Sequence, residues 1–179
     1  MQPDNHLRLY RPTIAAPPSD FRGTMRWRYG DTNPVVAAVA EDARVEVGDL
    51  VWHPPESSIR PAREAALWID EPYTPELLQQ FFCWGFLGVA MQRSETGEAA
   101  PIRVATTGVF VFDAPEGRYR LGTLMGPAVS NDGSVLRDQC VAVVSATSRA
   151  IGRVEKCEPT AQASVLVRIY SQVMAPIVA

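Results

Sequence analysis

The sequence has 179 residues, 46% of them hydrophobic, and a formal net charge of −3 at pH 7. A chain of this length can bury one core of its own, so the composition predicts a single globular domain with room for an additional arm. The mild negative charge argues against general nucleic-acid binding, and no apolar run is long enough to cross a bilayer, so neither nucleic acid nor a membrane is an expected partner.

Residues 1–26 are predicted to form an extended N-terminal arm, because four prolines in this stretch disfavour continuous helix. The segment is locally basic, with four arginines against two aspartates, and it also carries apolar side chains. A disordered tail and a tether that orders on a partner both fit this composition. If it is a tether, the residues expected to bind the partner are Leu7, Arg8, Leu9, Tyr10, Arg11, Ile14 and Arg22.

The compact domain is predicted to begin at Trp27, with a turn over 28–34 that is rich in Gly, Asp, Asn and Pro. Short strands are expected over 35–39 and 45–52, the second interrupted by a turn or bulge at Gly48 and Asp49. A short helix is then possible over 61–69.

Residues 74–84 carry a clearer helix signal. Thr74 is a suitable N-cap, Pro75 suits the first helical position, and Glu76 favours the first turn. Apolar residues follow at helical spacing, and Gly85 is expected to end the helix. Residues 86–91 are then predicted to form a buried strand, and residues 95–98 a turn.

The stretch 102–112 is predicted to be one long strand around which the domain is organised. Thr, Val and Phe dominate it, and its side chains alternate between two faces until Gly108, where a bulge or bend is expected. A kinked strand of this length can cross from one edge of a small barrel to another.

The remaining chain is predicted to contain further short strands over 119–125, 141–144, 150–154 and 164–170, with turns over 113–117 and 131–133. In the last strand, Val165, Val167 and Ile169 are expected to point inward. The predicted fold class is mainly β: a compact β-barrel or β-tulip-like domain over 27–174 with one short inserted helix, followed by a tail over 175–179.

The sequence contains none of the catalytic motifs that we considered. The single lysine, Lys156, lies outside any glycine loop, which argues against a P-loop NTPase, and the cysteines and histidines lack metal-ligand spacing. The cysteines at 83, 140 and 157 are interpreted as reduced thiols. Asp49 is interpreted as a turn residue and Glu155 as the partner of Arg153 in a surface ion pair. We therefore expect no catalytic residue, no cofactor and no metal.

Three tryptophans near the predicted helix are interpreted first as core residues and second as an interface patch; they are Trp52, Trp68 and Trp84. The first six residues lack the basic-then-apolar order of a signal peptide, so we expect a protein that is made in a host cytoplasm.

Five short stretches resemble the small β-rich phage proteins that are often labelled "predicted recombinase" and that are similar to capsid decoration (cement) proteins; they are Arg28–Pro34, Val47–Val51, Phe86–Met91, Ala105–Phe110 and Ala150–Val154. The recombinase label finds no support, because the ATP-binding loop that it requires is missing. The resemblance implies a non-enzymatic virion protein that binds the outer surface of the capsid and stabilises it. It also implies the major capsid protein as partner and a homotrimer as the assembled state.

The sequence leaves two alternatives to a decoration protein. The first is a head-completion or tail component of the virion. The second, from another class, is a small hydrolase or nucleotide-binding enzyme. An enzyme would have a deep pocket where titratable groups converge, whereas a lattice-binding module would have apolar and Arg-rich faces.

Overall fold

The structure is a computed structural model that describes residues 26–174, apart from 56, 71 and 99. The predicted arm residues at 7–11, 14 and 22 and the tail 175–179 lie outside the described residues. The strands are β1 (Trp27–Tyr29), β2 (Pro34–Ala38), β3 (Leu50–Trp52), β4 (Arg60–Pro61), β5 (Phe86–Ala90), β6 (Pro101–Ala105), β7 (Thr107–Gly117), β8 (Leu124–Val129), β9 (Leu136–Val143), β10 (Gly152–Val154) and β11 (Gln162–Tyr170). The helices are the α-helix α1 (Pro75–Trp84) and the 3-10 helices η1 (Ala62–Trp68), η2 (Thr147–Arg149) and η3 (Gln172–Met174).

The predicted fold class, a mainly β barrel, is confirmed. Strands β7, β11, β10, β8 and β9 pair in that order, and a parallel bridge between Asp113 and Cys140 brings β9 back to β7 and closes the barrel. Strand β1 pairs with β7 outside the ring. The barrel interior is apolar, and the inward side chains of β11 are Val165, Val167 and Ile169, as predicted.

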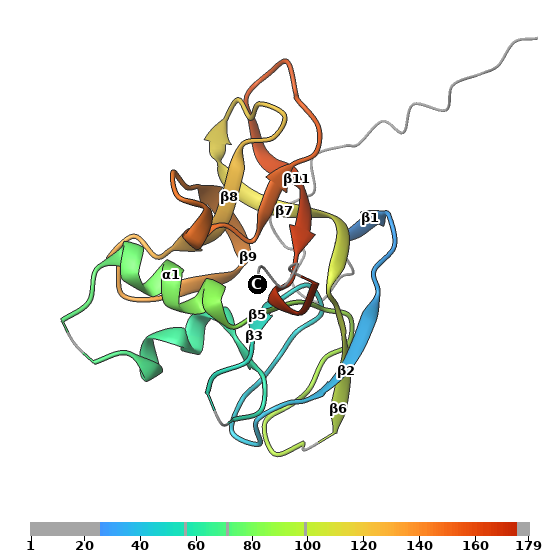
Figure 1. The fold of residues 1–179 in the computed structure, drawn as a ribbon, viewed down its shortest axis with the longest axis vertical. Helices are drawn as coiled ribbons and strands as arrows, with labels where there is room; N and C mark the ends of the chain where they lie inside the picture. Colours follow the sequence, from blue (N-terminus) through green and yellow to red (C-terminus); the bar gives the residue numbers. More distant parts are fainter. Residues whose placement is uncertain (1–25, 56, 71, 99, 175–179) are drawn as a thin grey trace, which may run out of the picture.

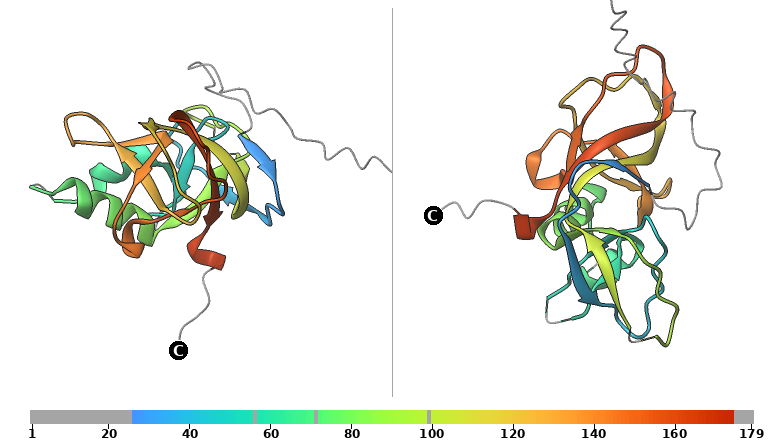
Figure 2. Two further views of the ribbon diagram at one scale, coloured as in Figure 1. Left: turned by 90° about the horizontal axis from the view of Figure 1, so that it is seen from above. Right: turned by 90° about the vertical axis from the view of Figure 1, so that its right-hand side faces the viewer.

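A second sheet with the strand order β2-β6-β5-β3-β4 lies below the barrel in Figure 1, and the right-hand view of Figure 2 shows the same stacking. This sheet has a second apolar cluster, which includes Val39, Val45, Ile59, Leu87 and Val104. The barrel cluster also includes Leu50, Trp52, Phe86 and Val89 of this sheet. The two β-units therefore share one apolar core, and a strand also passes from one unit to the other.

The predicted central strand makes that passage. It is divided into β6 of the second sheet and β7 of the barrel, and the break lies at Thr106 rather than at Gly108. Thr106 is fully buried, and its three polar groups bond three different residues. Its N–H donates to the Thr32 carbonyl at 2.9 Å, its hydroxyl donates to the Asn33 carbonyl at 2.7 Å, and its carbonyl accepts from the Ser171 N–H at 3.0 Å.

Helix α1 forms as predicted. The Thr74 hydroxyl accepts a hydrogen bond from the Leu77 N–H at 3.2 Å, and Pro75 occupies the first turn. Leu78 and Phe82 are fully buried, whereas Leu77 is exposed, so only one side of the helix packs against the domain. The possible helix over 61–69 is the shorter 3-10 helix η1.

Two predictions for the region after the central strand were wrong. The expected turn over 113–117 is the end of β7, because β11 pairs along this stretch as far as Gln162 opposite Gly117. The strand expected to begin at Tyr119 begins only at Leu124, because Gly122 adopts a φ of 80°, which a strand does not allow. The turn over 131–133 and the strands in the 141–144, 150–154 and 164–170 regions were predicted correctly.

Replacing Thr106 by Val tests the importance of the crossing point. The substitution keeps the β-branched shape but removes the donor to the Asn33 carbonyl, so we expect the free energy of unfolding to fall by about 1–2 kcal/mol. The measurement is equilibrium unfolding in urea. The matched control is Thr107→Val at the neighbouring half-buried position. The Thr107 hydroxyl donates to the Asp31 carbonyl and accepts from Asn33 Nδ2, both in contact with solvent, so its loss should cost less. Equal losses in the two variants would contradict a special role for Thr106.

Candidate functional site

Two hollows of similar volume and opposite chemistry lie on the described surface. The first, the polar hollow, has a volume of about 760 Å³ and is lined by Arg26, Arg44, Glu46, Asp49, Arg63, Asp113, Leu136, Arg137, Asp138, Gln139 and Cys140. The second, the apolar groove, has a volume of about 740 Å³ and is lined by Val35, Val36, Ala37, Ala38, His53, Ser57, Ser58, Ile59, Leu87 and Val173. Titratable groups converge only in the first, so it is the place to look for chemistry.

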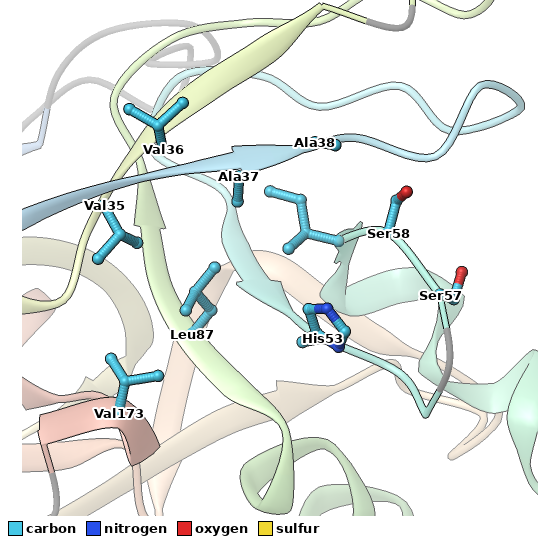
Figure 3. A pocket seen from close by; sticks show the side chains of 10 residues that line it. Val35, Val36, Ala37, Ala38, His53, Ser57, Ser58, Leu87 and Val173 are labelled. Carbon is cyan, nitrogen blue, oxygen red and sulfur yellow. The ribbon is translucent and has the colours of Figure 1, made fainter.

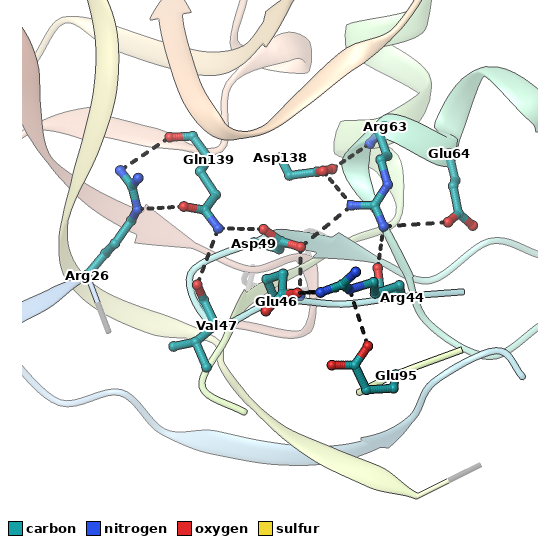
Figure 4. A network of polar contacts seen from close by, with 10 residues as sticks. All are labelled: Arg26, Arg44, Glu46, Val47, Asp49, Arg63, Glu64, Glu95, Asp138 and Gln139. Carbon is teal, nitrogen blue, oxygen red and sulfur yellow. Dashed lines mark hydrogen bonds and ion pairs between the residues drawn. The ribbon is translucent and has the colours of Figure 1, made fainter. Parts of the chain in front are cut away.

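The polar hollow holds a continuous chain of polar contacts between the two β-units (Figure 4). At its centre the Gln139 amide of β9 donates to Asp49 Oδ1 at 2.7 Å and accepts from Arg26 Nε at 3.0 Å. On the other side the Arg63 guanidinium of η1 lies 2.5 Å from Asp138 Oδ2 and 3.7 Å from Asp49 Oδ2. The chain therefore links the barrel strand β9 to the turn before β3 and to η1.

Asp49 is the electrostatically unusual member of this network. Burial raises the pKa of its carboxyl from 3.8 to about 6, and the nearby charge of Asp138 acts in the same direction. Hydrogen bonds from the Glu46 N–H and from Gln139 lower the pKa but only partly offset the burial. Arg63 compensates Asp49 weakly because it pairs more closely with Asp138.

A carboxyl with a pKa near 6 suits acid–base chemistry, but the geometry of Asp49 favours a structural role. Both of its oxygens are already engaged, Oδ1 by Gln139 and Oδ2 by the Glu46 N–H at 2.9 Å, and the residue is only 2% exposed. Burial also raises the pKa of the Cys140 thiol in the same hollow, which opposes nucleophilic chemistry there. The turn-aspartate interpretation of Asp49 agrees with these contacts.

The outer side of α1 carries an apolar surface, which we call the aromatic stripe: the exposed Leu77 and Trp84, the half-buried Phe81 between them, and the neighbouring exposed Trp68 of η1. Leu77, Phe81 and Trp84 have the i, i+4, i+7 spacing of one helix face. Trp84 is 62% exposed and Trp68 is 38% exposed. Phe81 and Trp68 are anchored from within, because their rings lie 5.3 Å and 6.3 Å from the buried ring of Trp52, measured between centroids. The ring of Trp84 contacts this group through Phe81, at 6.5 Å.

The tryptophans thus divide between the two roles considered from the sequence. Trp52 is a core residue at 1% exposure, whereas Trp84 and Trp68 lie at the surface. The helical spacing of 77–84 was correctly recognised, but it does not distinguish the buried pair, Leu78 and Phe82, from the outer residues of the same helix.

Other predicted polar residues have different partners from those expected. Glu155 pairs with Arg168 at 2.6 Å, while Arg153 donates to the Gly122 carbonyl, so the expected Glu155–Arg153 pair was wrong. The reason is strand register: Arg153 lies opposite Arg168 on adjacent strands, and Glu155 follows β10 within reach of the second arginine. Arg26, counted with the arm, is buried among Gln139, Asp113 and the Val111 carbonyl.

The cysteines are free thiols, as interpreted from the sequence. Cys83 and Cys140 are buried and Cys157 is exposed; burial raises the pKa of Cys83 to about 12. Within the described ranges, no group of three or more His, Cys, Asp or Glu residues is arranged to hold a metal ion. None of the helices described is long and apolar enough to cross a membrane.

Comparison with known proteins gives little similarity. No family model matches the chain, and no curated protein matches it. Among solved structures, the chain is similar to the one described as the crystal structure of head fiber gp8.5 N base in bacteriophage phi29. The two chains are 12% identical, the alignment covers 76% of this chain and 93% of that one, and the TM-score is 0.41.

The raised pKa of Asp49 predicts a pH dependence of stability. Between about pH 4 and pH 6 the folded state keeps a proton that the unfolded state releases, so the free energy of unfolding should fall as the pH rises through this range. The contribution is on the order of 3 kcal/mol. In Asp49→Asn this fall should vanish, which urea unfolding at several pH values would show. Glu155→Gln is the control that should keep it; identical slopes for Asp49→Asn and the unmodified protein would contradict the assignment.

Proposed function

We propose that this protein is a structural component of a phage virion that binds the outer surface of the assembled capsid and stabilises it as a decoration protein. The assignment to a capsid is supported by the resemblance of five stretches, including Phe86–Met91 and Ala150–Val154, to the phage family described above. Asp49 is the carboxyl best suited to acid–base chemistry by its pKa, but both of its oxygens accept hydrogen bonds from within the protein and are not free to act on a substrate. This supports a function in binding a partner rather than in catalysis.

The observation that carries the proposal is the aromatic stripe. Trp is among the residues most enriched where binding energy is concentrated in protein interfaces, and large apolar side chains are costly to leave in water. Leu77, Phe81, Trp84 and Trp68 present such side chains together, on elements held to the core from behind. We assign this surface to contact with a capsid subunit.

A second contact is proposed for the N-terminal segment 1–25. Its arginines suit carboxylates on neighbouring capsid subunits, and its apolar residues, among them Leu7, Leu9, Tyr10 and Ile14, suit grooves between them. Because the segment is tethered to a domain that is already bound, its effective concentration at a second site is high, and the two contacts strengthen each other.

The assembled state we propose is a homotrimer on the capsid. Weak interfaces between copies can form on the shell by mass action even where the free protein is a monomer. Copy number separates this proposal from a head-completion or tail component: a decoration protein covers the shell in many copies, whereas a completion component occupies one vertex or the tail. Counting copies on purified particles makes this distinction.

Trp84→Ala should weaken capsid binding roughly tenfold or more, since it removes the most exposed ring of the aromatic stripe. The measurement is co-sedimentation of the purified protein with capsids across a range of concentrations. Leu121→Ala is the matched control, because Leu121 is also an exposed apolar residue, at 70%, but lies outside the stripe. If both variants bind like the unmodified protein, the stripe does not make the contact; if the unmodified protein does not bind, the function is wrong.

Deleting residues 1–25 should leave a folded domain that binds capsids much more weakly. The deletion must stop before Arg26, because that side chain bonds Gln139 and Asp113 inside the domain, and its loss would confuse binding with stability. Thermal unfolding should therefore be nearly unchanged while co-sedimentation falls. Equal capsid binding by the two forms would show that the segment makes no contact.

A further inference from the structure

The apolar groove lies where the second sheet does not close. At one end the outer edge of β2 meets Ile59, whose N–H donates to the Ala38 carbonyl at 2.9 Å and whose carbonyl accepts from the Ala40 N–H at 3.1 Å. Toward the start of β2, from Ala37 back to Pro34, no strand in the described part of the chain pairs with this outer edge. Because backbone groups alternate along a strand, the N–H and carbonyl of Val36 point to the same edge as those of Ala38.

The gap exposes part of an apolar interior. Val35 and Ala37 pack against the second apolar cluster, and in Figure 3 their side chains point into the groove toward Leu87. His53, Ser57 and Ser58 line the end near Ala38. An apolar hollow of about 740 Å³ beside an open strand edge is the arrangement that accepts an added extended segment, with main-chain bonds on one side and side-chain pockets on the other.

The chain itself supplies such a segment at the mouth of the groove. Val173 of η3 lines the hollow near Leu87 and is 60% exposed (Figure 3). The sequence then continues after Met174 as Ala-Pro-Ile-Val-Ala, residues 175–179, without a charged or polar side chain. Five extended residues span roughly 17 Å, which is also the length of the five-residue β2.

We propose that residues 175–179 bind in the apolar groove of their own molecule, as an added strand beside β2 that fills the gap in the second sheet. Ile177 and Val178 provide the apolar side chains that cover Val35 and Ala37. Pro176 restricts the backbone at its own position and favours an extended Ala175, which lowers the entropy lost on binding. Attachment to Val173 makes the binding intramolecular, at an effective concentration that a separate molecule does not reach in dilute solution.

The test is disulfide cross-linking in the full-length protein, with Cys157→Ser to remove the exposed native thiol. Val178→Cys is combined with Ser58→Cys, at the end of the groove that a segment running from Val173 along β2 would reach. A matched variant adds Ile177→Asp, which keeps the tether and both thiols but places a charge on the segment. Bond formation under mild oxidation is followed on non-reducing gels and by mass spectrometry.

The expected result is a disulfide within one chain that forms at least about tenfold more slowly when Ile177→Asp is present. The charge prevents the segment from binding in the groove, so the two thiols of that variant meet only through random encounters of the tethered segment. Equal rates in the two variants would overturn the proposal. A disulfide between two chains would also overturn it, since the groove would then hold the segment of a second copy. The experiment needs no capsid, so its outcome is independent of the proposed function.

Discussion

The structure depends on one buried threonine where the chain passes from one β-unit to the other. Thr106 is the residue at which β6 ends and β7 begins, and its N–H, hydroxyl and carbonyl bond Thr32, Asn33 and Ser171. These partners come from the segment before β2 and from the residue after β11. One residue therefore links the crossing strand, the start of the second sheet and the end of the barrel. An apolar residue at this position would keep the two main-chain bonds but would lose the hydroxyl bond to the Asn33 carbonyl.

The polar chain around Asp49 is a second link between the same two units, on the side of β9 and η1. A network of this kind is stabilising only while every member is satisfied, and burial of the Asp49 carboxylate opposes folding at neutral pH. The network fixes the orientation of the two units. Gln139 accepts a hydrogen bond from Arg26 and donates one to Asp49, and these two bonds hold β9 in place against the turn before β3. The titratable residues that first suggest an active site therefore serve to align the two units.

Much of the fold follows from local signals, and the failures have a common cause. The cap at Thr74, the stop at Gly85 and the inward residues of β11 depend on neighbours in sequence, and they were predicted. The end of β7 at Gly117 and the partner of Glu155 depend on the register between strands distant in sequence, which no local pattern contains. The polar hollow was missed for the same reason, because its members come from five separate segments, and local patterns single out only Asp49 and Cys140 among them.

The division of α1 into two faces bears most directly on how such a domain binds a partner. Leu78 and Phe82 hold the helix against the core, and the Thr74 cap fixes its start, so the outer side chains stand on a backbone that is already ordered. Trp84 is the last residue of this helix, flanked in sequence by the core residues Phe82 and Phe86, and its ring lies 6.5 Å from that of Phe81, measured between centroids. A ring held in this way loses little freedom on binding, so more of the energy of its burial is available for affinity. In the proposed function the stripe and the segment 1–25 are complementary: the stripe would give specificity through a fixed shape, and the segment would add contact area through its attachment to the bound domain.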